Sequence, residues 1–408
     1  MRKIRVHYRG WGESWPLGTL ADDGTDLLFE YSAQALEQGL ELSPLHLKLR
    51  PQAYGGFPVE LSRLPGLIAD CLPDGWGLLL MDRLFRRNGL DPRSLSPLDR
   101  LAFLGDRAMG ALAFEPARSP ELARAELQIL DLARDVRTVI AGDDGAVLRE
   151  LVLLGGPPHG ARPKVLVHFD PDRRLINTCP MPHHRPLLVK FPAREEHKEV
   201  CAVEEVYSRI ARACGLTVPD TWHFDLGPRL AAFGTARFDV ERGLRVAVHT
   251  LAGALHADFR LPSAVDYTML LRATRLFTRD EREVQQAYER AVFNVLFNNR
   301  DDHPKNISFR LGHDRLWRLA PCYDLTFNRG PGGEHQMDVC GEGRNITREH
   351  LLQLAKQGGL RSDSAASALD RFLEHAGLFQ RLAKERKIRA STVKSIAAVI
   401  EGNRARLA

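Results

Sequence analysis

The chain has 408 residues, of which 44% are apolar and 27% are charged, and its formal net charge is +5. This length exceeds what one hydrophobic core supports, so we expect two or three packed units. The composition excludes a largely disordered chain, and the modest positive charge fits a phosphate-rich ligand without identifying a nucleic-acid binder.

Residues 1–118 form the first expected unit, an α+β module. Apolar alternation and turn residues predict its strands, while helical periodicity predicts its helices. Ser96 can cap a helix whose first turn holds Pro97. In chain order, the expected elements are strands over 4–6, 17–20 and 27–31, helices over 66–87 (interrupted at Pro73-Asp74-Gly75) and 96–105, and a strand over 111–114.

Residues 119–238 form the second expected unit. A linker and a helix from Glu121 to about Ile140 lead into a strand-rich region. Its helix is closed by Gly215, a residue suited to the left-handed helix end. The expected elements are strands over 165–169, 187–191 and 229–238, with the helix Lys198–Cys214 between the last two. This order of glycine-rich turn, strand, lysine-bearing strand, helix and strand resembles the small lobe of a kinase.

Residues 239–408 form the third expected unit, which is mostly helical. A long periodic helix is predicted over 280–298, with Thr278 as its cap. A hairpin follows, with strands over 307–311 and 315–320, and the last helix covers 390–407. The fold class is therefore α+β, with two kinase-like lobes and an additional amino-terminal module.

The cysteines and the chain start indicate a location. Met1–Val6 runs directly into a charged, alternating pattern that is unlike a signal peptide. No segment has the roughly 20 apolar residues of a membrane span. The six cysteines are scattered without a C-x-x-C pair, which is typical of reduced thiols. We expect a cytoplasmic protein with no membrane contact.

The segment Asn298–Asn306 carries the strongest chemical signal. It contains Asp301 and Asn306 in the D-x-x-x-x-N spacing that protein kinases use in their catalytic loop. There the aspartate accepts the proton of the substrate hydroxyl, and the asparagine binds Mg²⁺. Asp324 follows the predicted hairpin and could bind the same Mg²⁺, which prefers oxygen ligands and keeps several waters. The alternative is a capped polar turn, because Asp and Asn are common turn residues.

Lys190 ends an apolar strand, where a charge is costly unless it is paired. Glu204 or Glu205 on the next helix is the expected partner, as in the lysine–glutamate pair of kinases. The alternative is a surface lysine on an edge strand. The glycine-rich stretch 155–164 could approach phosphate closely, but it is neither a Walker A motif nor G-x-G-x-x-G.

Together these segments resemble the HipA family, the kinase toxins of bacterial type II toxin–antitoxin pairs. Gly160–Lys164 is similar to the family's G-x-R-P-K phosphate loop, and Asp301–Asn306 is similar to its D-x-H-x-K-N catalytic loop. The other similar segments are Val203–Pro219 (N-E helix and G-L-x-V-P turn), Ala236–Asp239 (E-R-F-D hinge), Leu319–Leu325 (L-A-P-x-Y-D-L), and Leu72–Trp76 with Gly110–Leu112 in the amino-terminal module.

The resemblance implies an ATP- and Mg²⁺-dependent serine/threonine-protein kinase. Asp301, Lys190 and Glu204 are then catalytic, and Asn306 and Asp324 bind the metal. The implied ATP-binding residues are His159, Gly160, Ala161, Arg162, Pro163, Lys164, Lys190, Ala236, Arg237, Phe238, His303, Lys305, Asn306, Tyr323 and Asp324. A protein substrate is implied, such as an aminoacyl-tRNA synthetase, together with a small HipB-like helix-turn-helix antitoxin that mediates DNA contact.

The sequence departs from the family's pattern at two places, and two alternative functions stay open. Pro157 and Pro158 occupy the stretch where family members often carry an autophosphorylated serine, and residues 155–164 contain no Ser or Thr. Ala236 replaces the hinge glutamate. The same residues would also suit a kinase-fold enzyme that phosphorylates a small molecule, and a non-catalytic nucleotide-binding corepressor or antitoxin is the remaining possibility.

Overall fold

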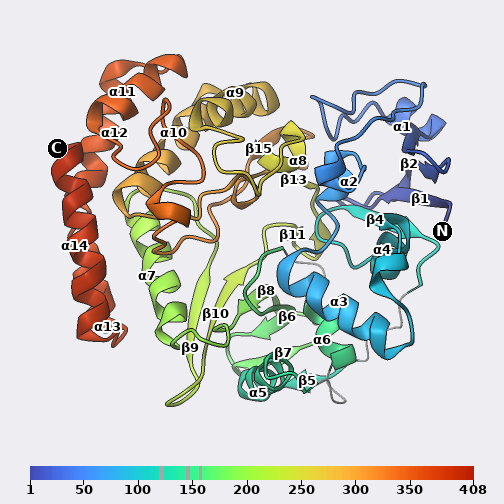
Figure 1. The fold of residues 1–408 in the computed structure, drawn as a ribbon, viewed down its shortest axis with the longest axis horizontal. Helices are drawn as coiled ribbons and strands as arrows, with labels where there is room; N and C mark the ends of the chain where they lie inside the picture. The colour runs from blue at the N-terminus through green and yellow to red at the C-terminus, as the bar shows by residue number, and fades with distance from the viewer. Residues whose placement is uncertain (119–123, 144–147, 156–158) are drawn as a thin grey trace. The chain divides into compact units, whose positions relative to one another are not determined.

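The computed structural model describes residues 1–118, 124–143, 148–155 and 159–408 (Figure 1). These residues form two compact units. The first comprises Met1–Cys201 and Asp220–His249, and the second comprises Ala202–Pro219 and Thr250–Ala408. The expected three-part division at residues 118 and 238 stays a prediction. No helix within the described ranges is long and apolar enough to cross a membrane.

The amino-terminal part of the first unit contains an antiparallel sheet in the order β3-β2-β1-β4. Its strands are β1 (Lys3–Tyr8), β2 (Trp15–Asp22), β3 (Leu27–Tyr31) and β4 (Leu112–Glu115), as expected. In β1, Ile4 and Val6 are buried while Lys3 and Arg5 are exposed, the alternation of a half-buried strand. The helices are α1 (Ala33–Gln38), α2 (Gly66–Ala69), α3 (Gly75–Arg87) and α4 (Pro97–Leu104). Ser96 caps α4 in a capping box with Asp99.

The second sheet of this unit has six strands in the order β5-β7-β6-β8-β10-β9. They are β5 (Glu126–Leu127), β6 (Lys164–Asp170), β7 (Leu175–Asn177), β8 (Arg185–Lys190), β9 (Thr221–Asp225) and β10 (Ala231–Ala236). Helices α5 (Ile129–Ile140) and α6 (Leu148–Gly155) precede β6. The predicted start at Glu121 lies outside the described residues, and the expected helix is wrong over 126–127, where β5 pairs with β7. Figure 1 shows α6 between α3 and β6.

Arg245 joins two distant segments within the first unit. It ends the short hairpin of β11 (Val240–Glu241) and β12 (Leu244–Arg245). Its guanidinium donates to four backbone carbonyls at distances of 2.8–2.9 Å, those of Asp106, Ala108, Gly110 and Leu112. Arg245 is half-buried, and these acceptors satisfy its guanidinium. The segment after β10 is thereby fixed to the amino-terminal module. From β13 (Val248–Thr250) the chain passes into the second unit.

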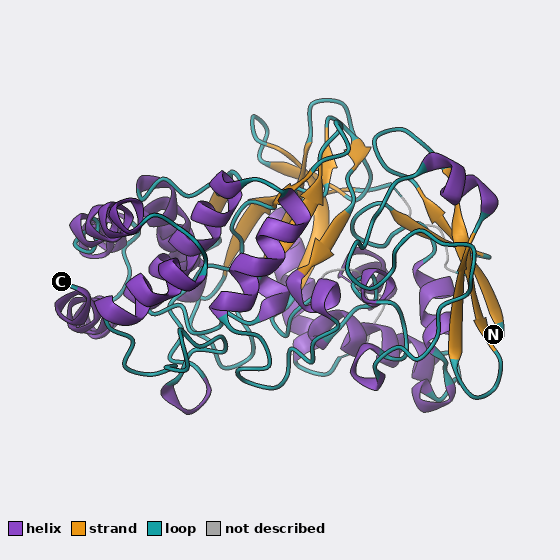
Figure 2. Cartoon of the chain, turned by 90° about the horizontal axis from the view of Figure 1, so that it is seen from above, coloured by secondary structure: helices purple, strands orange, loops and turns teal. Residues whose placement is uncertain are grey.

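The second unit is mainly helical, as Figure 2 shows for the region near the carboxyl terminus. It contains most of α7 (Glu199–Ala213) and the hairpin β14 (Ser308–Leu311) with β15 (Trp317–Leu319). Its other helices are α8 (Leu251–Leu255), α9 (Tyr267–Thr278), α10 (Glu281–Leu296), α11 (Arg348–Gln357), α12 (Ser362–Glu374), α13 (Leu378–Glu385) and α14 (Ala390–Leu407). The expected cap Thr278 is wrong. Asp280 caps α10 by accepting from the Arg282 N–H at 2.9 Å, and Thr278 is the last residue of α9.

Candidate active site

The predicted catalytic loop begins where α10 ends. Asn298 has φ +54°, the left-handed conformation that Asn tolerates better than most residues. This conformation stops the helix and turns the chain. The Asn298 side chain donates to the Asn328 carbonyl at 2.8 Å, and the Asn328 N–H donates to the Asn298 carbonyl at 3.0 Å. The entry of the loop is therefore held by a neighbouring segment.

Asp302 anchors the loop, a role that the sequence analysis did not assign. Its side chain is buried, and its carboxylate accepts from the Tyr267 hydroxyl at 2.6 Å, the His335 Nδ1 at 2.8 Å and the Gln336 N–H at 2.8 Å. Burial and the adjacent carboxylate raise the pKa of Tyr267 well above its ordinary value, so its hydroxyl stays a donor. Such charge-assisted bonds fix the backbone beside Asp301.

Asp301 itself has the opposite environment. Its side chain is 40% exposed, so its carboxylate can be approached from solvent. The His303 Nε2 lies 3.8 Å from one of its oxygens, which is beyond hydrogen-bond range. One aspartate of the pair is thus buried and hydrogen-bonded, and its neighbour is partly exposed.

Asn306 is oriented by the same loop. Its side-chain Nδ2 donates to the Asp301 carbonyl at 2.7 Å, and its N–H donates to the His303 carbonyl at 2.8 Å. Because the amide nitrogen is used in this way, the amide oxygen is the atom that Asn306 can offer to a cation. Oxygen donors are what Mg²⁺ requires, so this orientation fits the expected metal.

The segment bearing Asp324 is tied to the catalytic loop by Tyr323. The Tyr323 hydroxyl lies 2.6 Å from both the Lys305 carbonyl and the Ser308 hydroxyl. Residues 323 and 305 immediately precede the two expected metal ligands, so this contact joins the segments that carry them. Asp324 has φ +56°, and the Cys322 N–H donates to the Thr217 carbonyl at 2.8 Å. The second unit therefore brings together the segments of Asp301, Asn306 and Asp324.

The glycine-rich stretch and Lys190 belong to the first unit. Strand β8 lies between β6 and β10, and Lys190 is only 5% exposed, which rules out the edge-strand alternative. Lys190 is directly opposite Lys164 in the β6–β8 register, and Lys164 is also buried. Like charges placed opposite each other are unfavourable unless anions lie near. Two buried ammonium groups on one sheet face suit a site for phosphate.

Two arginines of the predicted site form ion pairs within the first unit. The Arg162 guanidinium contacts the Glu196 carboxylate at 3.0–3.1 Å. Arg237 pairs with buried Asp239, whose carboxylate also accepts from the Gly110 N–H at 3.0 Å. Although burial opposes its charge, these partners hold the pKa of Asp239 below its ordinary value.

Hydrogen bonds within the protein also occupy groups of the expected hinge and of one of the two candidate glutamates. The N–H groups of Ala236 and Arg237 donate to the carbonyls of Asp220 and Pro186. Any backbone contact from these two residues to an adenine would therefore use their carbonyl groups. In the second unit, the Glu205 carboxylate accepts two hydrogen bonds of 2.8 Å from the Arg386 guanidinium, and the expected pairing of Lys190 with Glu204 or Glu205 stays a prediction.

The comparisons with known proteins agree with these motifs. Residues 157–377 match the HipA-like C-terminal domain, and residues 10–115 match the HipA N-terminal domain. This chain belongs to the HipA family. No curated protein matches the sequence.

The solved structure of a HipA with low sequence identity has the same fold. HipA of Shewanella oneidensis MR-1, determined in complex with HipB and operator DNA, has 19% identity and a TM-score of 0.73. The match covers 99% of this chain and 97% of that one. The Helicobacter pylori proinflammatory kinase CtkA has 14% identity and a TM-score of 0.40, over 56% of this chain and 89% of that one. The α+β HipA fold expected from the sequence is thus confirmed.

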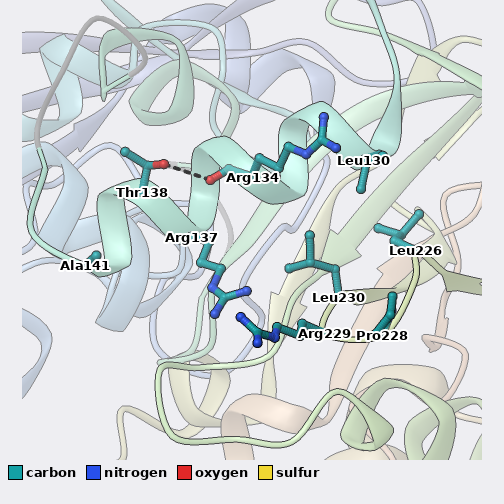
Figure 3. Close-up of a pocket in the computed structure, with 9 residues that line it drawn as sticks. All are labelled: Leu130, Arg134, Arg137, Thr138, Ala141, Leu226, Pro228, Arg229 and Leu230. Carbon is teal, nitrogen blue, oxygen red and sulfur yellow. Dashed lines mark hydrogen bonds between the residues drawn. The ribbon is translucent and has the colours of Figure 1, made fainter.

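A hollow in the first unit of this HipA-family chain is lined by none of the predicted site residues (Figure 3). It has a volume of about 630 Å³ and is formed by α5 and the β9–β10 turn. Its lining consists of Leu130, Arg134, Arg137, Thr138, Ala141, Leu226, Pro228, Arg229 and Leu230. None of these residues belongs to the HipA-like motifs. We therefore assign it no part in phosphoryl transfer.

Proposed function

We propose that this HipA-family chain is an ATP- and Mg²⁺-dependent serine/threonine-protein kinase and the toxin of a HipA/HipB-type pair. The observation that supports the proposal most strongly is the Tyr323–Lys305 contact, because it joins the segments of Asn306 and Asp324 beside the exposed carboxylate of Asp301. If residues 301–306 were no more than a capped polar turn after a helix, a contact with this second segment would not be required.

In the proposed reaction, Asp301 accepts the proton of the substrate hydroxyl as the hydroxyl oxygen bonds to the γ-phosphorus of ATP. The bond from that phosphorus to the β,γ-bridging oxygen breaks, and ADP leaves. Asn306, through its amide oxygen, and Asp324 would hold Mg²⁺, while Lys164 and Lys190 would hold phosphate oxygens. Bound Mg²⁺–ATP supplies the γ-phosphoryl group and the positive charge that offsets its negative oxygens. The buried Asp302 keeps the loop in place, so little reorganisation accompanies transfer.

The remaining site assignments extend this proposal. We assign Glu204 as the partner of Lys190, and the segments 159–164 and 236–238 together with His303, Lys305 and Tyr323 as ATP contacts. We place the functional boundaries at residues 118 and 238, between an amino-terminal module, a small lobe and a large lobe. The scattered cysteines support a cytoplasmic location.

The partners are proposed by analogy. The Shewanella HipA structure contains HipB and operator DNA. We propose a HipB-like antitoxin for this chain, with DNA contact through that complex. A protein is the proposed substrate, with an aminoacyl-tRNA synthetase as the first candidate.

Transfer of labelled phosphate from ATP in a cell lysate tests the proposal. The wild-type chain is compared with Asp301→Asn and with the control Asp314→Asn, whose side chain lies on the exposed turn between β14 and β15. We expect one or more labelled protein bands with wild type and control and none with Asp301→Asn. Label found only in small molecules would favour the small-molecule kinase, and tight ATP binding without transfer would favour the non-catalytic corepressor.

A further inference from the structure

The motif Leu72–Trp76 in the amino-terminal module has no part in the reaction proposed above, yet it contacts the predicted phosphate loop at three points within the first unit. The Asp74 carboxylate accepts a hydrogen bond from the Gly160 N–H. The backbone N–H of Trp76 donates to the Gly160 carbonyl at 3.0 Å. The His159 Nε2 lies 3.0 Å from the Leu72 carbonyl. Two consecutive loop residues are thus bonded to one short segment.

The bonding partners of Asp74 are unusual for its position. Asp74 is the N-cap residue of α3, where aspartate normally accepts a bond from its own helix. Here its side chain makes no capping bond to α3. It bonds Gly160 instead, and the Gly160 carbonyl accepts from the first turn of α3 in return. The helix start and the loop therefore exchange the groups that each would otherwise leave unsatisfied.

The close approach depends on glycine. Gly75 has φ +45°, and a Cβ atom added there would lie 2.5 Å from the Gly160 carbonyl oxygen and 2.8 Å from the Ala161 Cα. Both contacts are shorter than van der Waals separation and involve backbone atoms, which have little freedom to move away. The sequence Asp74-Gly75 thus supplies a carboxylate together with room for the loop to reach it.

The contact extends to a predicted phosphate ligand. The Gly160 N–H that Asp74 binds belongs to the same peptide group as the His159 carbonyl, which accepts from the Lys164 ammonium. The Gly160 carbonyl that Trp76 binds belongs to the next peptide group. Two successive peptide planes are therefore oriented from the amino-terminal module, and one of them bonds the buried Lys164.

We propose that Asp74 is a positioning residue that orders the loop 159–164, and through it Lys164, before ATP binds. The inference rests on the proposed function of this loop as an ATP-phosphate site. A loop already ordered loses less conformational freedom when its ligand arrives, so the affinity for ATP is higher. In this way the amino-terminal module becomes part of the nucleotide site.

Kinetics of the full chain separate positioning from general stability. Asp74→Ala removes the acceptor, whereas Asp74→Asn keeps a side-chain oxygen that can accept from Gly160. We expect Asp74→Ala to raise KM for ATP about tenfold with little change in kcat, a loss typical of one charge-assisted bond. Asp74→Asn should stay near wild type. The control Asp82→Ala on the same helix breaks the ion pair with Arg100 and should leave KM unchanged.

Amide hydrogen exchange of the peptide 159–164 without ATP tests the contact independently of any kinase activity. We expect faster exchange in Asp74→Ala and in Gly75→Ala, which perturbs the contact from the other side. Unchanged exchange in both variants would overturn the inference. Faster exchange in the variants, combined with no ATP binding by the wild-type chain, would instead refute the proposed nucleotide site, so the two failures are distinguishable.

Discussion

Asp301 and Asp302 are adjacent in sequence but differ in burial, and this contrast gives a sharp prediction. Asp302→Ala deletes a buried carboxylate that accepts three hydrogen bonds and leaves the Tyr267 hydroxyl, the His335 ring and the Gln336 N–H without that acceptor. We expect a loss of about 3–5 kcal/mol in the free energy of unfolding, the range for breaking a buried charged network. Asp301→Ala removes a side chain that is 40% exposed and should change stability by less than about 0.5 kcal/mol.

Urea denaturation followed by far-UV circular dichroism measures the difference, because the second unit contributes much of the helix. Asp302→Ala should unfold at a clearly lower urea concentration than wild type, and Asp301→Ala should unfold at the wild-type midpoint. Phosphoryl transfer should be lost in both variants, in Asp302→Ala because the loop is no longer held. Equal stability of the two variants would refute the assignment of Asp302 as the anchor of the loop.

A glutamate pair, a histidine with a lowered pKa and the phosphate-loop sequence give three further predictions. Glu204→Gln should reduce phosphoryl transfer at nearly wild-type stability, whereas Glu205→Gln, which weakens the ion pair with Arg386, should lower the melting temperature. Transfer assays and thermal melts measure the two effects. The reverse pattern would make Glu205 the catalytic glutamate and Glu204 the structural one. Burial, with help from the positive charge of Arg237, lowers the pKa of His168 from 6.5 to about 4. Between these pH values the unfolded chain binds more protons than the folded chain, so the free energy of unfolding should fall as pH drops from 6.5 to 4. His168→Gln should flatten this pH dependence in urea titrations, and an unchanged pH dependence would contradict the prediction. Since residues 155–164 contain no Ser or Thr, mass spectrometry after incubation with ATP should find no phosphate there, and a phosphorylated peptide from this stretch would contradict the expectation.

Local patterns predicted much of the fold. Alternation identified β1, periodicity identified α10 and α14, and Ser96-Pro97 marked the start of α4. The cap of α10 was misplaced because Thr278 and Asp280 are both good N-cap residues, and only the end of α9 decides between them. Strand β5 is too short for a periodic signal, so the helical pattern around it extended too far.

The site was predictable only in part. The spacing of Asp301 and Asn306 and the following Asp324 can be read along the chain, because each belongs to a local motif. The contacts of Asp302 and Asp74 cannot, since the partners of Asp302 lie 33–35 residues away and the partner of Asp74 lies 86 residues away. Asp302 is indistinguishable from Asp301 by residue type, and only burial separates their roles. Asp74 reads as a helix cap until the loop that it actually binds is seen.

The central claim is that Asn306 and Asp324 form one metal–nucleotide site. Calorimetric titration of ATP at increasing Mg²⁺ concentration tests it most directly, with wild type, Asn306→Ala, Asp324→Ala and the control Asp314→Asn. The account predicts that Mg²⁺ strengthens ATP binding to the wild type and the control, and that this gain is lost in both alanine variants. A full Mg²⁺-dependent gain in either alanine variant would contradict the proposed site.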